Sequence, residues 1–236
     1  DLKDVTNLAS LVDKIGEISG IDWIRLLYVQ PQHVSDQLIE TIAANEKVCH
    51  YLDMPLQHAS AGVIRRMNRW GEGDRYLSII DRLRAKVPDI ALRTSLIVGF
   101  PGETDEDIMI LSRFLRAARM DYVGVFKFSA EDGTPAAGLP DQIENEIINE
   151  RSTQIEALID EMARSSQSRF VGRSLKVLIE SSDSGRCIGR SRYQAPEIDG
   201  EVIVEGCSLK PGVITDVRIT GHGNYDLFGT RVTCRT

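Results

Sequence analysis

The sequence contains few cysteines, and their spacing matches no common disulfide or metal-binding pattern. Four cysteines occur among 236 residues, at Cys49, Cys187, Cys207 and Cys234, and no two of them form a C-x-x-C motif. We therefore expect free thiols in a reducing compartment, and neither a disulfide framework nor a metal site within this chain.

Long hydrophobic runs are also missing. No stretch approaches the roughly 20 apolar residues of a membrane span, and the polar start DLKDVTNLAS has no secretory hydrophobic region. With 42% hydrophobic and 27% charged residues, the composition is that of an ordinary globular protein. We expect a cytoplasmic protein without a membrane partner. The first residue is not methionine, which suggests a fragment.

Negative charge is concentrated in the first part of the chain. Residues 1–167 hold 18 basic and 27 acidic residues, a net charge of −9, whereas residues 168–236 hold 10 and 8, a net charge of +2. The acidic part suits cationic partners, while the second part leaves nucleic acid or a basic protein open. Solvated surface charge is the simpler explanation.

Strand and helix patterns alternate through the first 140 residues. Helical spacing of apolar residues predicts a helix from Val5 to Gly20, and Ser35 and Asp74 begin two more. Apolar runs predict four strands, at Trp23–Val29, Tyr51–Leu56, Leu92–Val98 and Tyr122–Phe128. This alternation indicates βαβ units around a parallel sheet, either an open sheet or part of a barrel.

The stretch LRTSLIVGFPGET, residues 92–104, organises this region. A buried strand ends in Gly99 and Gly102, which let the backbone turn sharply and come close to a ligand. Thr104 then has the position of an N-cap, and Asp107 stands at the capping-box position of the next helix. In parallel α/β folds ligands lie at this end of a strand, although a structural turn without a ligand is the alternative.

The pattern changes after Pro140. One long helix is expected over residues 142–167, and five short strand patterns separated by glycines follow. We predict a small five-stranded barrel of the OB or a related type. The expected organisation is an α/β region at 1–140, a connecting helix at 141–167 and a β-barrel at 168–236.

Polar residues follow or interrupt each predicted strand. If the sheet is parallel, these residues gather at one rim of the sheet. In chain order they are Gln30 and His33, then Gln57, His58 and Ser60, then Arg93 and Ser95, and finally Lys127, Ser129 and Asp132. Arg93 is the most informative, because an arginine within an apolar strand needs an anionic partner. That partner is either a protein carboxylate or a ligand carboxylate. Pro55 is expected to turn Gln57 and His58 towards the rim.

Several motifs resemble a known family. They are YLDMPLQHAS at 51–60, MNRW at 67–70, LRTSLIVGFPGETDED at 92–107, APEIDG at 195–200 and YDLFG at 225–229. The chain resembles the radical S-adenosylmethionine (SAM) methylthiotransferases over essentially its whole length. It is most similar to the branch that modifies an aspartate of small-subunit ribosomal protein twelve. The tRNA-modifying branch usually shows Gln-Ser where this chain has Gln57 and His58.

The resemblance implies a fold and a chemistry. The first region would be the C-terminal portion of a partial (βα) radical SAM barrel, and the β-barrel would be a TRAM domain. The whole enzyme would cleave SAM reductively, abstract hydrogen from the aspartate β-carbon and insert a methylthio group. It would use two [4Fe–4S] clusters, a flavodoxin-like electron donor and the ribosomal protein, or the subunit that carries it, as substrate.

The family's cluster motif, C-x-x-x-C-x-x-C, does not occur here. Cluster thiolates are indispensable to that chemistry, so we expect the isolated chain to be inactive, with no catalytic or metal-ligating residue of its own. The resemblance implies cofactor contacts through seven residues: Gln57, His58, Arg93, Ser95, Val98, Gly99 and Phe126. Gln57 and His58 would face the reacting centre, and His58 would also meet the substrate.

Three alternatives are kept. A tRNA-adenosine methylthiotransferase belongs to the same family. A phosphate-binding enzyme would use the N-terminus of the helix after Thr104, but Asp105, Glu106 and Asp107 would repel an anion. A module that binds RNA or protein would use the β-barrel, although a net charge of +2 and few aromatic residues argue against strong RNA binding.

Overall fold

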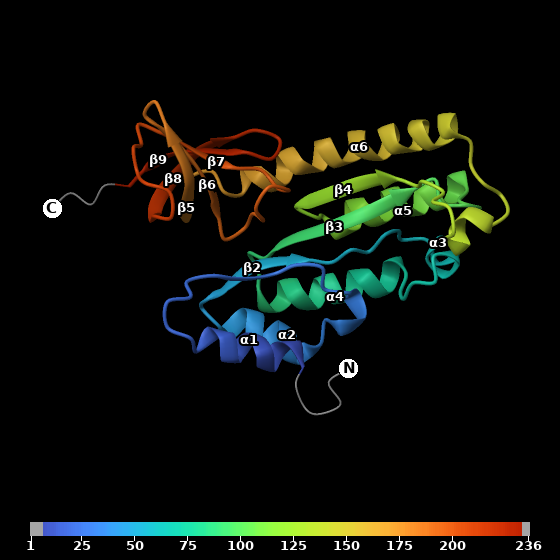
Figure 1. Ribbon diagram of the computed structural model, residues 1–236, viewed down its shortest axis with the longest axis horizontal. Helices are drawn as coiled ribbons and strands as arrows, with labels where there is room; N and C mark the ends of the chain where they lie inside the picture. The colour runs from blue at the N-terminus through green and yellow to red at the C-terminus, as the bar shows by residue number, and fades with distance from the viewer. Residues whose placement is uncertain (1–6, 233–236) are drawn as a thin grey trace. The chain divides into compact units, whose positions relative to one another are not determined.

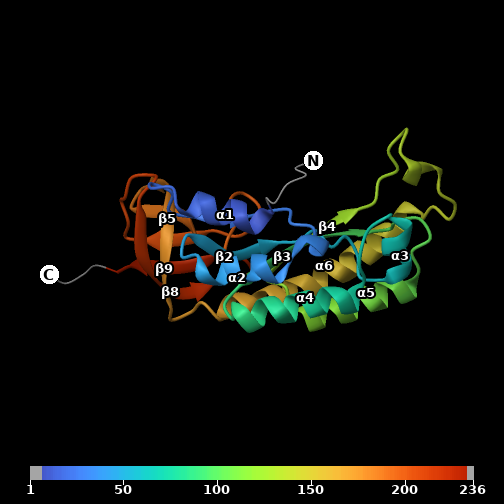
Figure 2. The ribbon, with the colours of Figure 1, turned by 90° about the horizontal axis from the view of Figure 1, so that it is seen from below.

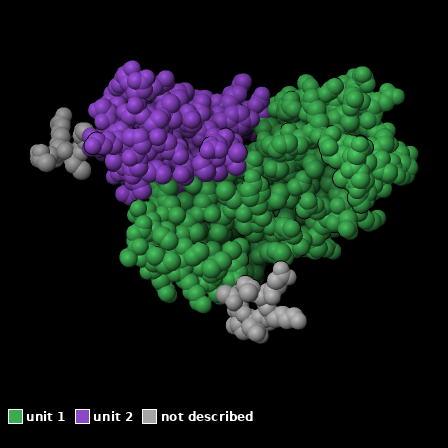
Figure 3. Space-filling model, viewed as in Figure 1, with its two compact units in different colours: residues 1–159 green, residues 160–236 purple. Residues whose placement is uncertain are grey.

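The computed structural model describes residues 7–232 and divides into two compact units. Unit 1 is Asp1–Ile159 and unit 2 is Asp160–Thr236 (Figure 3). The division falls inside one long helix, α6 (Asn145–Ser168). Unit 1 contains a parallel sheet with helices, and unit 2 contains a closed β-barrel. The expected fold class, an α/β sheet followed by a small all-β barrel, is therefore confirmed.

Unit 1 is built on four parallel strands in the order β1-β2-β3-β4 (Figure 1). Their bounds are β1 (Ile24–Leu26), β2 (Val48–Asp53), β3 (Ala91–Val98) and β4 (Tyr122–Lys127). All three neighbouring pairs are parallel. Because the carboxyl ends of parallel strands share one edge, the loops that follow β1 to β4 leave the sheet on the same side.

Helices connect the strands and bury one apolar side each. They are α1 (Leu8–Gly16), α2 (Asp36–Ala44), α3 (Ala61–Arg66), α4 (Gly73–Lys86) and α5 (Asp105–Ala118), with short 3₁₀ turns at Pro31–His33 and Pro135–Gly138. Helices α2, α4 and α5 lie on one side of the sheet (Figure 2). Their buried residues include Leu38, Leu83 and Leu111. This packing supports the strands whose ends carry the predicted site residues.

Unit 2 contains five strands that close into a barrel in the order β5-β6-β7-β9-β8. Their bounds are β5 (Ser174–Asp183), β6 (Arg186–Ser191), β7 (Val202–Glu205), β8 (Ile214–His222) and β9 (Leu227–Arg231). Alternate residues point inward and form the core, among them Val177, Val204 and Leu227, all fully buried. The predicted five-stranded barrel is confirmed.

The expectation that all cysteines are free thiols is wrong for two of them. Cys187 and Cys207 form a disulfide, with Cα atoms 5.4 Å apart and a sequence separation of 20. Cys187 pairs with Val204 in the barrel register, and the positive φ of Gly206 turns the chain so that Cys207 points into the same core. Sequence spacing does not reveal this register. Cys49 is a free thiol, as predicted, and it is buried; Cys234 lies outside the described residues.

Candidate functional site at the strand ends

The register of the sheet gathers three of the predicted site residues on one face. Arg93 of β3 is paired with Asp53 on β2 and with Tyr122 on β4, and Ser95 is paired with Gly124. Side chains of in-register neighbours, and of every second residue along a strand, point to the same face. Arg93, Ser95 and Phe126 therefore share a face, with Phe126 nearest the carboxyl end of β4.

Arg93 has a carboxylate partner within the protein. Its Nη1 donates to Asp53 Oδ1 at 3.0 Å and to Ser95 Oγ at 3.3 Å. Asp53 is fully buried, and its second oxygen accepts the backbone N–H of Tyr28 at 3.1 Å. Sequence reasoning missed Asp53, although the argument used for Arg93, a charge within an apolar strand, applies to it equally. Of the two partners that the sequence left open for Arg93, the structure therefore shows the protein carboxylate.

Beyond this ion pair the face becomes apolar and open. Phe126 is 56% exposed, on β4, an edge strand of the sheet. Gly124 keeps the space beside it free, since a Cβ there would lie 3.4 Å from Phe126 Cε2 and 3.6 Å from Arg93 Nη2. An exposed aromatic ring beside a glycine and an arginine suits a ligand with a flat apolar part and a polar part.

The turn after β3 has the conformation that the sequence predicted. Gly99 and Gly102 both have positive φ, +83° and +75°. A Cβ on Gly99 would also lie 2.5 Å from Ile148 Cγ1 of α6, so only glycine fits there. Val98 is fully buried just before the turn. The turn is therefore a fixed backbone feature at the edge where ligands of such sheets bind.

A buried carboxylate closes this turn. Both side-chain oxygens of Glu103 accept the Gly99 backbone N–H, at 3.0 and 3.1 Å. Arg151 of α6 donates from Nη1 to Glu103 Oε1, also at 3.0 Å. Sequence reasoning missed Glu103 and Arg151. The position of Glu103 directly after a glycine turn could have indicated the first, whereas the second comes from a helix 48 residues away.

His58 and Gln57 are placed differently from each other. Gln57 is half-buried with a positive φ of 70° and forms an isolated bridge with Leu96. His58 is fully buried: its Nδ1 accepts the Ser60 backbone N–H at 3.0 Å, and its Nε2 lies 3.5 Å from Glu103 Oε2. The structure therefore places His58 beneath the surface beside the turn, and its role towards a substrate stays a prediction.

The helix after the turn begins with the predicted capping box. Thr104 Oγ1 accepts the Asp107 N–H, and Asp107 Oδ2 accepts the Thr104 N–H at 2.8 Å. Ser60 Oγ also donates to Asp107. Burial acts to raise the pKa of Asp107, but the hydrogen bonds from Ser60 and Thr104, together with His58 nearby, outweigh it and lower that pKa. Asp107 therefore joins the segment around His58 to α5.

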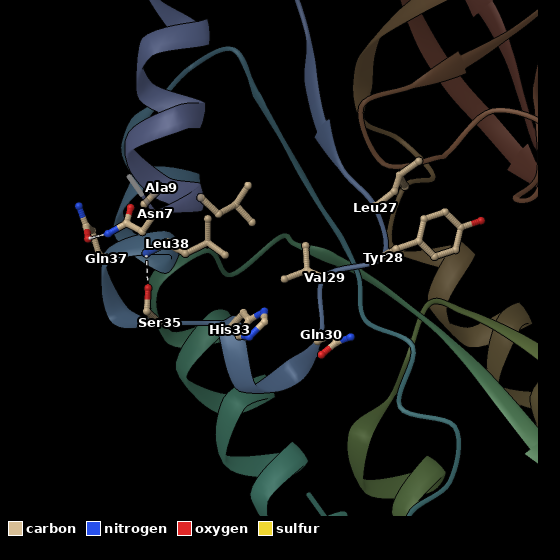
Figure 4. Close-up of a pocket in the computed structure, with 11 residues that line it drawn as sticks. Asn7, Ala9, Leu27, Tyr28, Val29, Gln30, His33, Ser35, Gln37 and Leu38 are labelled. Carbon is tan, nitrogen blue, oxygen red and sulfur yellow. Dashed lines mark hydrogen bonds between the residues drawn. The ribbon is translucent and has the colours of Figure 1, made fainter. Parts of the chain in front are cut away.

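A separate pocket of about 690 Å³ lies after β1 (Figure 4). Gln30 and His33, two of the predicted rim residues, line it together with apolar side chains such as Val29 and Leu38. The Asn7 side chain donates to Gln37 at 2.7 Å, and Ser35 accepts the Leu38 N–H at 3.2 Å. The other predicted site residues do not line this pocket, so the strand-end residues fall into two groups.

Within residues 7–232, no group of three or more His, Cys, Asp or Glu side chains could hold a metal ion. Over the same residues, no helix combines the length and the hydropathy of a membrane span.

Comparison with known families identifies both units. A model described as the Radical SAM superfamily matches residues 4–115, and a model described as the TRAM domain matches residues 171–232. The chain therefore contains a radical SAM region and a TRAM domain. Strands β1 to β3, Arg93 and the glycine turn fall within the radical SAM match, whereas β4 with Phe126 follows it, and the closed barrel falls within the TRAM match.

Curated relatives narrow the resemblance. The proteins named ribosomal protein uS12 methylthiotransferase RimO from Roseiflexus castenholzii, Chloroflexus aurantiacus and Geobacter sulfurreducens are 45%, 45% and 41% identical to this chain over 97% of its length. They confirm the resemblance to methylthiotransferases. The chain covers 48%, 51% and 52% of these proteins, so it spans about half the length of the curated relatives it matches.

One solved radical SAM enzyme has a similar fold. Coproporphyrinogen III oxidase (HemN) from Escherichia coli superposes with a TM-score of 0.50 at 13% identity. The match covers 72% of this chain and 44% of that one. At such low identity the likeness concerns the fold alone, and it supports the partial radical SAM barrel.

Proposed function

We propose that this chain is part of a methylthiotransferase that adds a methylthio group to the β-carbon of an aspartate in ribosomal protein uS12. The observation that carries the proposal is the 45% identity to proteins of that name over 97% of the chain. The motifs around His58, the glycine turn and the two barrel stretches APEIDG and YDLFG support the same branch.

The open sheet face fits SAM as a ligand. Gly124 leaves a space between the exposed Phe126 ring and the Arg93 guanidinium, which suits a molecule with an adenine ring and a charged amino-acid part. We assign the apolar contacts to Gly99 and Phe126, and the polar contacts to Gln57, Arg93 and Ser95. Val98 is fully buried on the other face of β3, so any contact it makes would use its backbone. His58 would support this site from beneath and act on the substrate side. When bound, SAM supplies the radical chemistry of the superfamily.

The iron–sulfur clusters do not fit residues of this chain. The four cysteines include no C-x-x-x-C-x-x-C motif, and the described part of the chain holds no group of metal ligands. Cluster ligands would have to come from another segment or chain. What this chain contributes is therefore positioning of SAM and of the substrate.

Charge supports a basic protein substrate. Residues 1–167 carry a net charge of −9 and the barrel region a net charge of +2. Ribosomal proteins are basic, and complementary charge speeds encounter and favours the right partner. The cytoplasm, a flavodoxin-like electron donor and weak rather than strong RNA binding complete the proposal.

The decisive experiment uses a protein that carries this chain behind a segment with the C-x-x-x-C-x-x-C motif. After reconstitution with iron and sulfide, it is incubated with SAM, a reductant and purified uS12. Tandem mass spectrometry should locate one methylthio group on an aspartate of uS12. Methylthiolation of tRNA adenosine instead would support the other branch of the family, and modification of neither would refute the proposal.

A further inference from the structure

Helix α6 contacts the glycine turn through two residues that lie one helical turn apart. Ile148 packs against Gly99 so closely that a Cβ there would be 2.5 Å from its Cγ1. Arg151 Nη1 donates to Glu103 Oε1 and to the Glu103 carbonyl oxygen, each at 3.0 Å. Residues three apart share one face of a helix, so α6 meets the turn with an apolar and a charged contact side by side.

The charged contact is made in a dry environment. The Glu103 side chain is 0% exposed and that of Arg151 is 11% exposed. A buried carboxylate is costly unless a cation and hydrogen bonds meet it, and here Arg151 and the Gly99 N–H do so. Arg151 also contacts Asp105, but that side chain is 91% exposed, so this second pair adds little.

The carboxylate thus links the helix to the turn. Gly99 donates its N–H to Glu103, and Glu103 is neutralised by Arg151. His58 Nε2 lies 3.5 Å from the same carboxylate and makes no hydrogen bond within the described residues. It is therefore a weaker neighbour of Glu103 than Arg151. Without Arg151, the buried carboxylate would lose its cation and draw water, and its bond to Gly99 would weaken.

We propose that Arg151 is a positioning residue, which holds the Gly99–Glu103 turn in its cofactor-facing conformation through the Glu103 carboxylate. That this conformation faces the cofactor rests on the proposed function, whereas the contact of Arg151 with the turn does not. Arg151 reaches neither Phe126 nor Arg93 through any contact the structure shows. It therefore acts on the ligand site only through the backbone of the turn.

Amide hydrogen exchange of Gly99, followed by NMR in the chain itself, tests the hold on the turn. In Arg151→Met, we expect the Gly99 amide to exchange about 10- to 100-fold faster, because a charge-assisted hydrogen bond is weakened. Arg151→Lys keeps the positive charge but loses the planar guanidinium with its several N–H donors. The increase in the exchange rate of the Gly99 amide should therefore be smaller in this variant. Arg113→Met, an exposed arginine of α5, is the matched control and should leave Gly99 unchanged.

Binding of S-adenosylhomocysteine, measured by calorimetry, tests the link to the ligand. Arg151→Met should raise its Kd about 10-fold, and Arg113→Met should not. Faster Gly99 exchange with an unchanged Kd would overturn the positioning role. Unchanged Gly99 exchange in Arg151→Met, or in Arg151→Lys if the first variant does not fold, would overturn the proposal altogether. If the wild-type chain binds no S-adenosylhomocysteine, the cofactor site fails, while faster exchange still supports the hold on the turn.

Discussion

Gly99 combines two constraints, a positive φ and a close neighbour. Replacing it with alanine forces a Cβ into the left-handed region at φ +83° and to within 2.5 Å of Ile148. We expect Gly99→Ala to lower the free energy of unfolding by about 2 to 4 kcal/mol, from strain plus overpacking. Gly133→Ala is the matched control, because Gly133 also has a positive φ, +79°, but a Cβ there would meet no atom within 4 Å. We expect Gly133→Ala to lower the free energy of unfolding by about 1 kcal/mol. Urea unfolding measures the free energy of unfolding of both variants. Equal losses of stability in the two variants would show that Ile148 does not constrain the turn.

Arg93 is a residue for which the sequence left two partners open and the structure shows one. Arg93→Met should destabilise the chain by about 3 to 5 kcal/mol, since it leaves the buried Asp53 carboxylate without its cation. Adding Asp53→Asn should recover part of that loss, and the double-mutant cycle gives the coupling energy. A loss under about 1 kcal/mol for Arg93→Met would mean that the pair does not persist in solution.

Among the helices, α5 offers a test that depends on pH. The pKa of Asp107 is lowered in the folded chain, so its hydrogen bonds contribute stability above the unfolded value, around 3.9, and lose it as the pH falls through the folded value. At pH 7, Asp107→Asn should cost about 1 kcal/mol. The difference from the wild type should shrink below about pH 4. The control is Glu106→Gln, in the same helical turn but exposed, whose stability difference from the wild type should not depend on pH in this way. If Asp107→Asn costs the same stability at every pH, the Asp107 carboxylate is not the group whose pKa is lowered.

Helices and strands with strong local signals could be predicted from the sequence. Their exact boundaries could be predicted less well. The Ser35 cap of α2, the capping box of α5 and the strand before Gly99 follow from residues next to one another. Strand β2 was expected at Tyr51–Leu56 but spans Val48–Asp53, because its ladder stops before Pro55. The long helix begins at Asn145 rather than at 142, since the Gln142 side chain donates to carbonyls of the preceding turn.

The candidate site was predictable only where one strand carries its own signal. Arg93, Ser95 and the glycine turn follow from β3 alone. Asp53, Arg151 and the inward position of His58 depend on which strands pair and on how a distant helix packs. The disulfide depends in the same way on the barrel register. These are contacts between segments far apart in the sequence, which local patterns do not encode.

At the scale of the whole molecule, the two units differ in their covalent cross-linking and in their fluorophores. The described disulfide joins Cys187 to Cys207, both in unit 2. The two tryptophans of the chain, Trp23 and Trp70, both belong to unit 1. Tryptophan fluorescence therefore reports on unit 1 alone, whereas calorimetry reports on both units. Reduction of the disulfide should act on only one of these signals.

We expect reduction with dithiothreitol to lower the Tm of the barrel by about 10 to 20 °C in calorimetry, because opening a loop of this size releases roughly 3 kcal/mol of unfolded-state entropy in a domain of fewer than 100 residues. The tryptophan transition of unit 1 should stay where it is, since no described disulfide crosses into it. The double variant C187A/C207A should unfold at the reduced Tm and no longer respond to dithiothreitol. If the tryptophan transition shifts together with the barrel, the two units unfold as one cooperative system, because a change confined to unit 2 would then be felt by Trp23 and Trp70. If neither transition shifts, the disulfide does not form in solution, and the cysteines are the free thiols that their spacing in the sequence suggested.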